Sequence, residues 1–140
     1  MAQAKVRWVE NLMFAATSPS GHSIMLDGDE PMGTDQAVHP GEMLLLGLGG
    51  CTGKDVISLL KKMRQEVDSF EILLDGEARE EHPKAWTKMS LKNVVTGNSI
   101  DEEKLKKAID LSHERYCRVA ATLKPAVEME FSWEIKQRGE

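Results

Sequence analysis

The 140-residue chain has few cysteines, few aromatic residues and no excess of basic charge. It contains two cysteines and 5% aromatic residues, and its 23 acidic side chains outnumber the 18 basic ones. The net charge of −5 disfavours non-specific binding to nucleic acid, which requires basic surfaces. Two cysteines cannot form the disulfide framework of a small secreted protein, so an apolar core must stabilise the fold. We expect one domain over residues 1–140.

Long apolar runs are also absent. The first residues, MAQAKVRWVEN, have no apolar signal core, and the longest run of apolar residues and glycines is Met43 to Cys51. That run is far shorter than the roughly 18 residues typical of a membrane span. We therefore expect a cytoplasmic protein without membrane or nucleic-acid partners. In a reducing cytosol, cysteines 66 positions apart are predicted to be free thiols or a cycling redox pair.

The segment from Pro40 to Arg64 is predicted to be a long central helix, because it is the only strongly apolar stretch of sufficient length. At about 100° per residue, one face of this helix contains Val56, Leu59, Leu60 and Met63, and another contains Cys51, Asp55, Ser58 and Lys62. Leu44 and Leu48 fall on the same side as Cys51. The Cys51 thiol is therefore expected to lie where an apolar wall meets a polar mouth.

The segments around this helix have the patterns of strands and of a second helix. Residues 5–14 and 22–26 are predicted to pair as an N-terminal hairpin, and residues 67–79 and 85–95 as a second hairpin. Ser99 and Glu102 form a capping-box pattern for a helix that ends near Cys117. After a turn at 119–124, residues 127–135 alternate as a final strand. This order predicts an α+β domain rather than a βαβ array.

Several known motifs fail on spacing. A P-loop would require glycine at position 48 and Ser or Thr at position 55, and the dinucleotide fingerprint lacks its third glycine. Residues 49–53 fit the G-x-C-x-G pattern of a nucleophile elbow, but only about 90 residues follow, so a cysteine hydrolase is a remote alternative. His113 and Cys117 are four residues apart, without a second ligand pair. We interpret His113 as a solvated helix residue and predict no metal site.

Buried apolar packing is the usual role of a free cysteine, but the sequence around both cysteines resembles a known family. HPGEMLLLGLGGCTGKDV surrounds Cys51, and RYCRVAATL surrounds Cys117. These paired motifs, with Pro40 eleven residues before the first cysteine, resemble those of the OsmC/Ohr proteins of osmotic induction and organic-hydroperoxide resistance. The resemblance extends to the order of elements along essentially the whole chain.

The resemblance implies an OsmC-like fold, in which antiparallel sheets surround a long central helix and two subunits intertwine as a homodimer. It also implies a thiol peroxidase that needs no cofactor. Cys51 would attack an organic hydroperoxide and become a sulfenic acid, and Cys117 would then condense with it to a disulfide. A dithiol reductant, lipoyl-linked in some members, would restore both thiols. Leu44 and Leu48 would form the pocket wall that favours organic peroxides.

The sequence departs from the family where the family places its activating groups. Family peroxidases carry an arginine that holds the peroxide, but no arginine occurs between Trp8 and Cys51. Arg7 and Arg118 are the candidate replacements. The family's glutamate would align with Gly41, with Glu42 displaced by one position. Nine residues along an ideal helix place Glu42 opposite Cys51, so Glu42 could activate the thiol only after a helix irregularity or from the partner chain. A second hypothesis is therefore an OsmC-fold protein that binds an apolar ligand or partner without efficient turnover.

Overall fold

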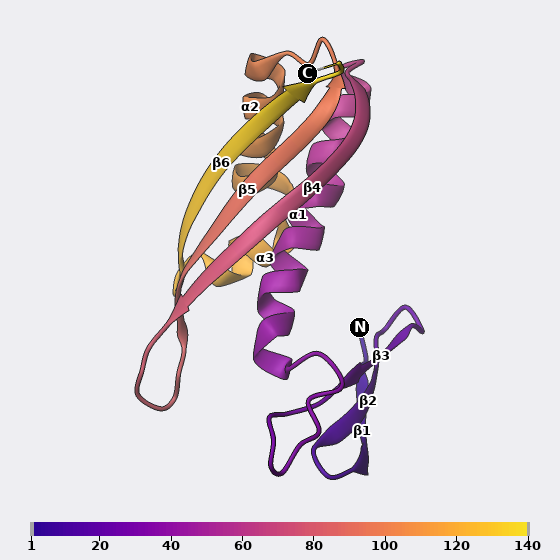
Figure 1. Ribbon diagram of the computed structural model, residues 1–140, viewed down its shortest axis with the longest axis vertical. Helices are drawn as coiled ribbons and strands as arrows, with labels where there is room; N and C mark the ends of the chain where they lie inside the picture. Colours follow the sequence, from indigo (N-terminus) through magenta and orange to yellow (C-terminus); the bar gives the residue numbers. More distant parts are fainter. Residues whose placement is uncertain (1, 140) are drawn as a thin grey trace. The chain divides into compact units, whose positions relative to one another are not determined.

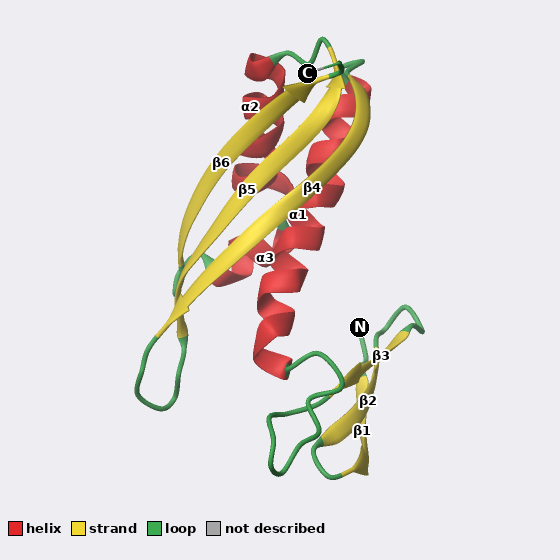
Figure 2. Cartoon of the chain, viewed as in Figure 1, coloured by secondary structure: helices red, strands yellow, loops and turns green. Residues whose placement is uncertain are grey.

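The computed structural model describes residues 2–139, which form two compact units that divide between Leu44 and Leu45. The elements of each unit are drawn in Figure 1 and coloured by type in Figure 2. Strands and helices occur in both the order and the mixture expected, so the predicted α+β class is confirmed. The two units are described separately below.

The first unit contains an antiparallel sheet in the order β1-β2-β3. Its strands are β1 (Lys5–Glu10), β2 (Met13–Thr17) and β3 (Ser23–Leu26). The prediction of one strand over residues 5–14 is wrong, because the chain turns at Asn11, which has a φ of 49°. Asparagine tolerates this left-handed conformation, and its carbonyl accepts a 2.8 Å hydrogen bond from Trp8 Nε1. The expected hairpin is therefore a three-stranded meander.

The loop after β3 is organised around the buried carboxylate of Asp27. Asp27 is 1% exposed and accepts hydrogen bonds from the Gly28 amide (2.7 Å), the Thr34 hydroxyl (2.7 Å) and the Gln36 amide (3.1 Å). The Thr34 bond first, and then the Gly28 amide, lowers the pKa of Asp27 from 3.8 to about 2. The charged form of this side chain thus holds a loop that has no regular secondary structure.

The second unit is a three-stranded sheet with its helices on one face (Figure 1). The helix α1 (Met43–Lys62) follows the 3-10 turn η1 (Pro40–Glu42) and begins just before this unit. The elements that follow it are β4 (Glu66–Ala78), β5 (Trp86–Asn98), α2 (Glu102–Leu111), the π-helical turn η2 (Ser112–Tyr116), α3 (Arg118–Leu123) and β6 (Glu128–Gln137). The predicted central helix, the second hairpin and the final strand are confirmed. The stretch expected to be a turn at 119–124 is largely the short helix α3.

The sheet order is β4-β5-β6, and its two strand pairings differ in direction. β4 and β5 are antiparallel, as a hairpin must be. β5 and β6 are parallel, with Leu91 opposite Phe131 and Val95 opposite Ile135. The expectation of antiparallel sheets is therefore wrong for this pair. The reason is that α2, η2 and α3 carry the chain back along the sheet before β6 begins, as a helical crossover does.

The start of α2 also differs from the capping-box prediction. The N-cap is Asp101, whose carboxylate accepts from the amides of Glu103 and Lys104. Ser99 lies two residues earlier in a left-handed turn, with a φ of 53°. Asp and Ser are similarly good N-caps, so the sequence alone could not decide between two acceptors this close together.

The core between helices and sheet consists of two apolar clusters. One contains Val56, Leu60, Val95, Ile100, Leu105, Ala108 and Ile109, and the other contains Leu48, Met89, Leu91, Cys117, Ala120 and Val127. On β5, Asn93 lies between Leu91 of the second cluster and Val95 of the first and is fully buried. Its amide nitrogen donates to the Ser132 carbonyl (3.3 Å), whereas its Oδ1 has no hydrogen-bond partner among the described residues. A polar group thus separates the clusters.

The segment Pro40–Lys62 is long and apolar enough to cross a membrane, with a mean hydropathy of 1.4 over its most apolar window. The core helices of soluble proteins can have the same length and composition. Leu48, Val56 and Leu60 of α1 are fully buried in the two clusters. Only 28% of the window is buried by this chain, however, which leaves much of an apolar helix uncovered.

Gly97 is required by the close approach of β4 and β5. A Cβ there would overlap the Glu66 carbonyl oxygen and crowd the side chain of Ile100. We predict that Gly97→Ala lowers the free energy of unfolding by about 1–3 kcal/mol, because backbone atoms must move apart. Urea unfolding measures the change. Gly41→Ala is the control, since its Cβ would meet nothing within 4 Å. Equal stability of the two variants would contradict the prediction.

Asp27 should make the first unit sensitive to acid. Since its pKa falls from 3.8 to about 2 on folding, its contribution to stability is complete above pH 3.8 and is lost as the pH falls toward 2. We predict that protection of the Gly28 and Gln36 amides from hydrogen exchange declines across this range, after correction for intrinsic rates. Asp27→Asn should lack protection throughout, whereas the exposed control Glu30→Gln should follow the parent. Unchanged protection in Asp27→Asn would exclude this role.

Candidate active site

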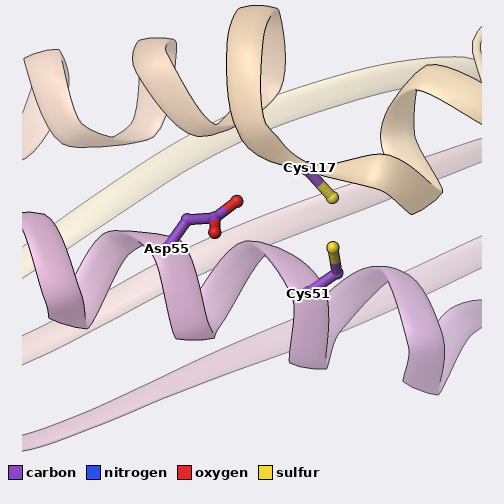
Figure 3. Close-up of side chains that lie close together, drawn as sticks. All are labelled: Cys51, Asp55 and Cys117. Carbon is purple, nitrogen blue, oxygen red and sulfur yellow. The ribbon is translucent and has the colours of Figure 1, made fainter.

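The two cysteines lie together, although 65 residues separate them in the chain. Cys51 and Asp55 lie one turn apart on α1, and Cys117 lies between η2 and α3 (Figure 3). The Cys51 sulfur, the Cys117 sulfur and a carboxylate oxygen of Asp55 are all within 4.8 Å of one another. Both cysteines are free thiols. The three side chains point toward a common centre.

Cys117 reaches this position because α2 does not continue as a regular helix. The π-helical turn Ser112–Tyr116 has a wider ring, closed by a 2.7 Å hydrogen bond from the Cys117 amide to the Ser112 carbonyl. The backbone is then extended at Cys117, which becomes the N-cap of α3. Its sulfur accepts a 3.3 Å hydrogen bond from the Ala120 amide. The interruption between two helices therefore directs this thiol toward α1.

The two thiols have different surroundings. Cys117 is 2% exposed and belongs to the core cluster that contains Leu48, whereas Cys51 is partly exposed. Burial raises the pKa of Cys117, and the Ala120 amide opposes this only in part. The Thr52 hydroxyl lies 3.7 Å from the Cys117 sulfur. Cys117 is therefore held as a protonated thiol at neutral pH, and Cys51 is the more accessible of the pair.

Asp55 is the site residue to which the sequence analysis assigned no role. Its side chain is 11% exposed and accepts a 2.9 Å hydrogen bond from the Ser112 hydroxyl. The Lys54 ammonium lies 3.6 Å from its other oxygen. The spacing of four residues from Cys51 on one helix face was the signal, but only the fold shows that Cys117 and Ser112 approach the same face.

A hollow of about 340 Å³ borders the Asp55 side of the site. Its walls are formed by Lys54, Asp55, Ser58, Leu59, Lys62 and Tyr116. Asp55 thus lies near both cysteine sulfurs and also lines a hollow at the surface.

The other predicted site residues occupy varied positions. Arg118 is exposed at the start of α3, next to Cys117, and Leu48 is fully buried beside Cys117 in the core. In the first unit, Leu44 is 44% exposed and Arg7 is exposed on β1. The Glu42 carboxylate accepts a 2.9 Å hydrogen bond from the His39 amide and caps η1. Leu48 is thus the one among these that packs with Cys117.

The interpretation of His113 as a solvated helix residue is wrong. Its ring packs against Phe131 with centroids 4.4 Å apart, and its Nδ1 is buried without a hydrogen-bond partner among the described residues. Burial, and then the nearby Lys124, lower the pKa of His113. The neutral imidazole of His113 therefore packs against Phe131 of the sheet.

A second hollow, of about 470 Å³, runs along α1 and β4. It is lined mostly by apolar side chains and glycines: Leu46, Gly49, Gly50, Gly53, Ile57, Phe70, Glu71, Ile72 and Leu74. Leu46, at 53% exposed, is a large apolar side chain of this lining that is in contact with solvent. We call this hollow the α1/β4 groove. Its lining is as apolar as a protein interior, although it is exposed to solvent in the single chain.

Comparisons with known proteins agree with this architecture. The sequence model described as "OsmC-like protein" matches residues 33–132. Protein YhfA of Escherichia coli strain K12 is 44% identical over 133 residues, which cover 95% of this chain and 97% of the relative. A hypothetical protein from Aquifex aeolicus VF5 is 33% identical, with a TM-score of 0.86 and coverage of 99% of this chain and 98% of that one.

More distant solved structures share the fold. The organic hydroperoxide resistance protein OhrB of Bacillus subtilis is 17% identical, with a TM-score of 0.60 and coverage of 96% of this chain and 98% of that one. At this identity the similarity supports the fold alone. Because the family match spans most of the chain and relatives above 30% identity align nearly end to end, the chain belongs to the OsmC-like protein family.

Proposed function

We propose that this protein is a thiol peroxidase that reduces organic hydroperoxides through a disulfide cycle between Cys51 and Cys117. The observation that supports the proposal best is that the two sulfurs lie within 4.8 Å of each other, although they come from distant segments. A disulfide needs Cα atoms about 4.4–6.8 Å apart, and small movements of α3 relative to α1 can bring the sulfurs to bonding distance.

The difference in exposure assigns the roles. Cys51, partly exposed, attacks the terminal peroxide oxygen as a thiolate, the O–O bond breaks, and the alkoxide takes a proton to leave as an alcohol. Cys51 is then a sulfenic acid. The Cys117 sulfur displaces its hydroxyl, which leaves as water, and the disulfide forms. A dithiol reductant, with a lipoyl group as one candidate, exchanges with the disulfide and restores both thiols.

The surroundings of Cys117 suit a resolving thiol. A buried, protonated cysteine is protected from direct oxidation, because the thiolate is the reactive form. Leu48 and Ala120 exclude water from it. The sulfenic acid on Cys51 therefore meets Cys117 before it meets a second peroxide, which prevents over-oxidation.

The reaction can be followed by intact mass after one equivalent of cumene hydroperoxide under reducing-agent-free conditions. We predict that the parent loses two hydrogen atoms, that Cys51→Ser keeps its thiol, and that Cys117→Ser gains oxygen on Cys51. An equal amount of hydrogen peroxide should react more slowly. Parent protein that retains both thiols would reject the peroxidase and leave the non-catalytic ligand-binding alternative.

Methionine oxidation must be separated from sulfenic acid in this experiment, because the chain contains eight methionines. The variant with both cysteines replaced by serine reports methionine oxidation alone. Dimedone, which reacts with sulfenic acid, should label Cys117→Ser and leave this double variant unlabelled.

We further propose that the protein acts as a homodimer whose second copy covers the α1/β4 groove. Support comes from the 470 Å³ apolar hollow, from the exposure of Leu46, and from the low burial of an apolar helix within one chain. A Cβ added at Gly50 would meet nothing within 4 Å, so the α1 backbone at this point leaves room for a neighbouring helix to approach closely. A second copy is the occupant that the family resemblance implies.

The dimer can be tested by sedimentation velocity at micromolar concentration. We predict that the parent sediments as a dimer and that Leu46→Asp produces monomer or unfolded chain, because a charge would be buried at the contact. Lys106→Asp, which changes an exposed residue on α2, should remain dimeric. A folded parent monomer at this concentration would refute the proposal.

A further inference from the structure

We propose that Cys51, Asp55 and Cys117 of the reduced protein bind a zinc ion. This goes beyond the proposed peroxidase function, since binding requires only the reduced thiols and no turnover. It also differs from the sequence-based expectation, which considered His113 with Cys117 and found no further ligands. The site depends instead on two ligands from α1 and one from the junction of η2 and α3.

The donor atoms suit zinc. Thiolate sulfur and carboxylate oxygen are common ligands of Zn²⁺, and three protein ligands with one open position are typical of non-structural zinc sites. With ligand distances of about 2.3 Å for sulfur and 2.1 Å for oxygen, tetrahedral coordination places donor atoms roughly 3.6–3.8 Å apart. The three donors here lie within 4.8 Å of one another. A contraction of at most about 1.2 Å would complete the geometry.

Asp55 is oriented as a metal ligand must be. Ser112 donates to Oδ2 at 2.9 Å, and Lys54 lies 3.6 Å from Oδ1 on the exposed side. A hydrogen bond such as that from Ser112 fixes the direction of a ligating carboxylate and supports affinity. Ser112 is itself fully buried and also accepts the Cys117 amide through its carbonyl, so one residue positions two of the three ligands.

The negative charges of Asp55 and of the two thiolates together favour the binding of a cation at this site. A carboxylate beside two sulfurs repels negative charge on them, whereas a divalent ion between all three groups offsets their charges. Binding would release one proton from each thiol. The 340 Å³ hollow next to Asp55 provides access for the ion and space for water at the fourth position.

Zinc and peroxide would compete for the same electron pairs. When a hydroperoxide oxidises the two zinc-bound thiolates, the sulfurs become a disulfide, the peroxide takes up two protons and becomes alcohol and water, and Zn²⁺ is released. The site would thus hold zinc when reduced and lose it when oxidised. Bound zinc would also slow attack by Cys51, because its sulfur lone pair is shared with the metal.

The test uses reduced full-length protein in anaerobic buffer, without any peroxide. We expect one Zn²⁺ per chain in competition with a chromophoric chelator, and Co²⁺ in its place should give sulfur-to-cobalt charge-transfer absorption. Cys51→Ser, Cys117→Ser and Asp55→Asn should each lose this site, and Ser112→Ala should weaken it about 10–100-fold. Asp110→Asn, a change of an exposed acid on α2, should bind as the parent does.

Two further measurements test whether zinc binds at the cysteines and whether binding requires the reduced thiols. Asp29, Asp35 and His39 are another group of ligand-type side chains among the described residues, so His39→Ala is included and should keep the charge-transfer band. Protein oxidised to the disulfide should not bind. If Asp55→Asn fails to fold, Asp55→Glu should bind, since it retains the carboxylate. Absence of the band in the parent, or zinc binding by oxidised protein, would overturn the proposal, whether or not the peroxidase assay succeeds.

Discussion

The packing of the helical crossover onto α1 is the constraint on which the site depends. β5 and β6 are parallel neighbours, so the chain between them must return along the sheet, and only α2, η2 and α3 make that return. The π-helical turn places an extended residue in the middle of this path, directly against α1. Without that wider turn, a regular helix would carry Cys117 in another direction. The proximity of the sulfurs is therefore a property of the topology as much as of the cysteines.

Burial and charge act differently on the three grouped side chains. Burial keeps Cys117 protonated, whereas the Asp55 carboxylate is 11% exposed, accepts a hydrogen bond from Ser112 and lies 3.6 Å from the Lys54 ammonium. Cys51 is the partly exposed thiol of the group. One site therefore combines a shielded thiol, an accessible thiol and an oriented carboxylate. This combination suits both the sulfur redox chemistry and the metal binding that we propose.

Much of the fold followed from periodic patterns, and the misses have local physical causes. The long apolar helix and the 66–98 hairpin were predictable, because both are long and strongly patterned. The positions of the turn at Asn11 and of the N-cap at Asp101 each depended on a single residue, and neighbouring residues were equally suitable for the same role. The direction of β6 and the burial of His113 were set by long-range packing. The sequence placed Asp55 on the same helix face as Cys51, but its hydrogen-bond partner Ser112 lies 57 residues later in the chain.

The buried amide of Asn93 separates the interior of the second unit into two apolar parts. It stands between the cluster around Leu60 and the cluster around Cys117, with an oxygen that no described residue satisfies. Apolar contacts along β5 are therefore interrupted at mid-sheet. The two halves of the interior are joined through α1, which contributes buried residues to both clusters, and through Phe131, which packs against both. The cysteine sulfurs and the buried face of α2 therefore belong to different parts of the interior, and a substitution in one cluster changes apolar packing that the other cluster largely does not share.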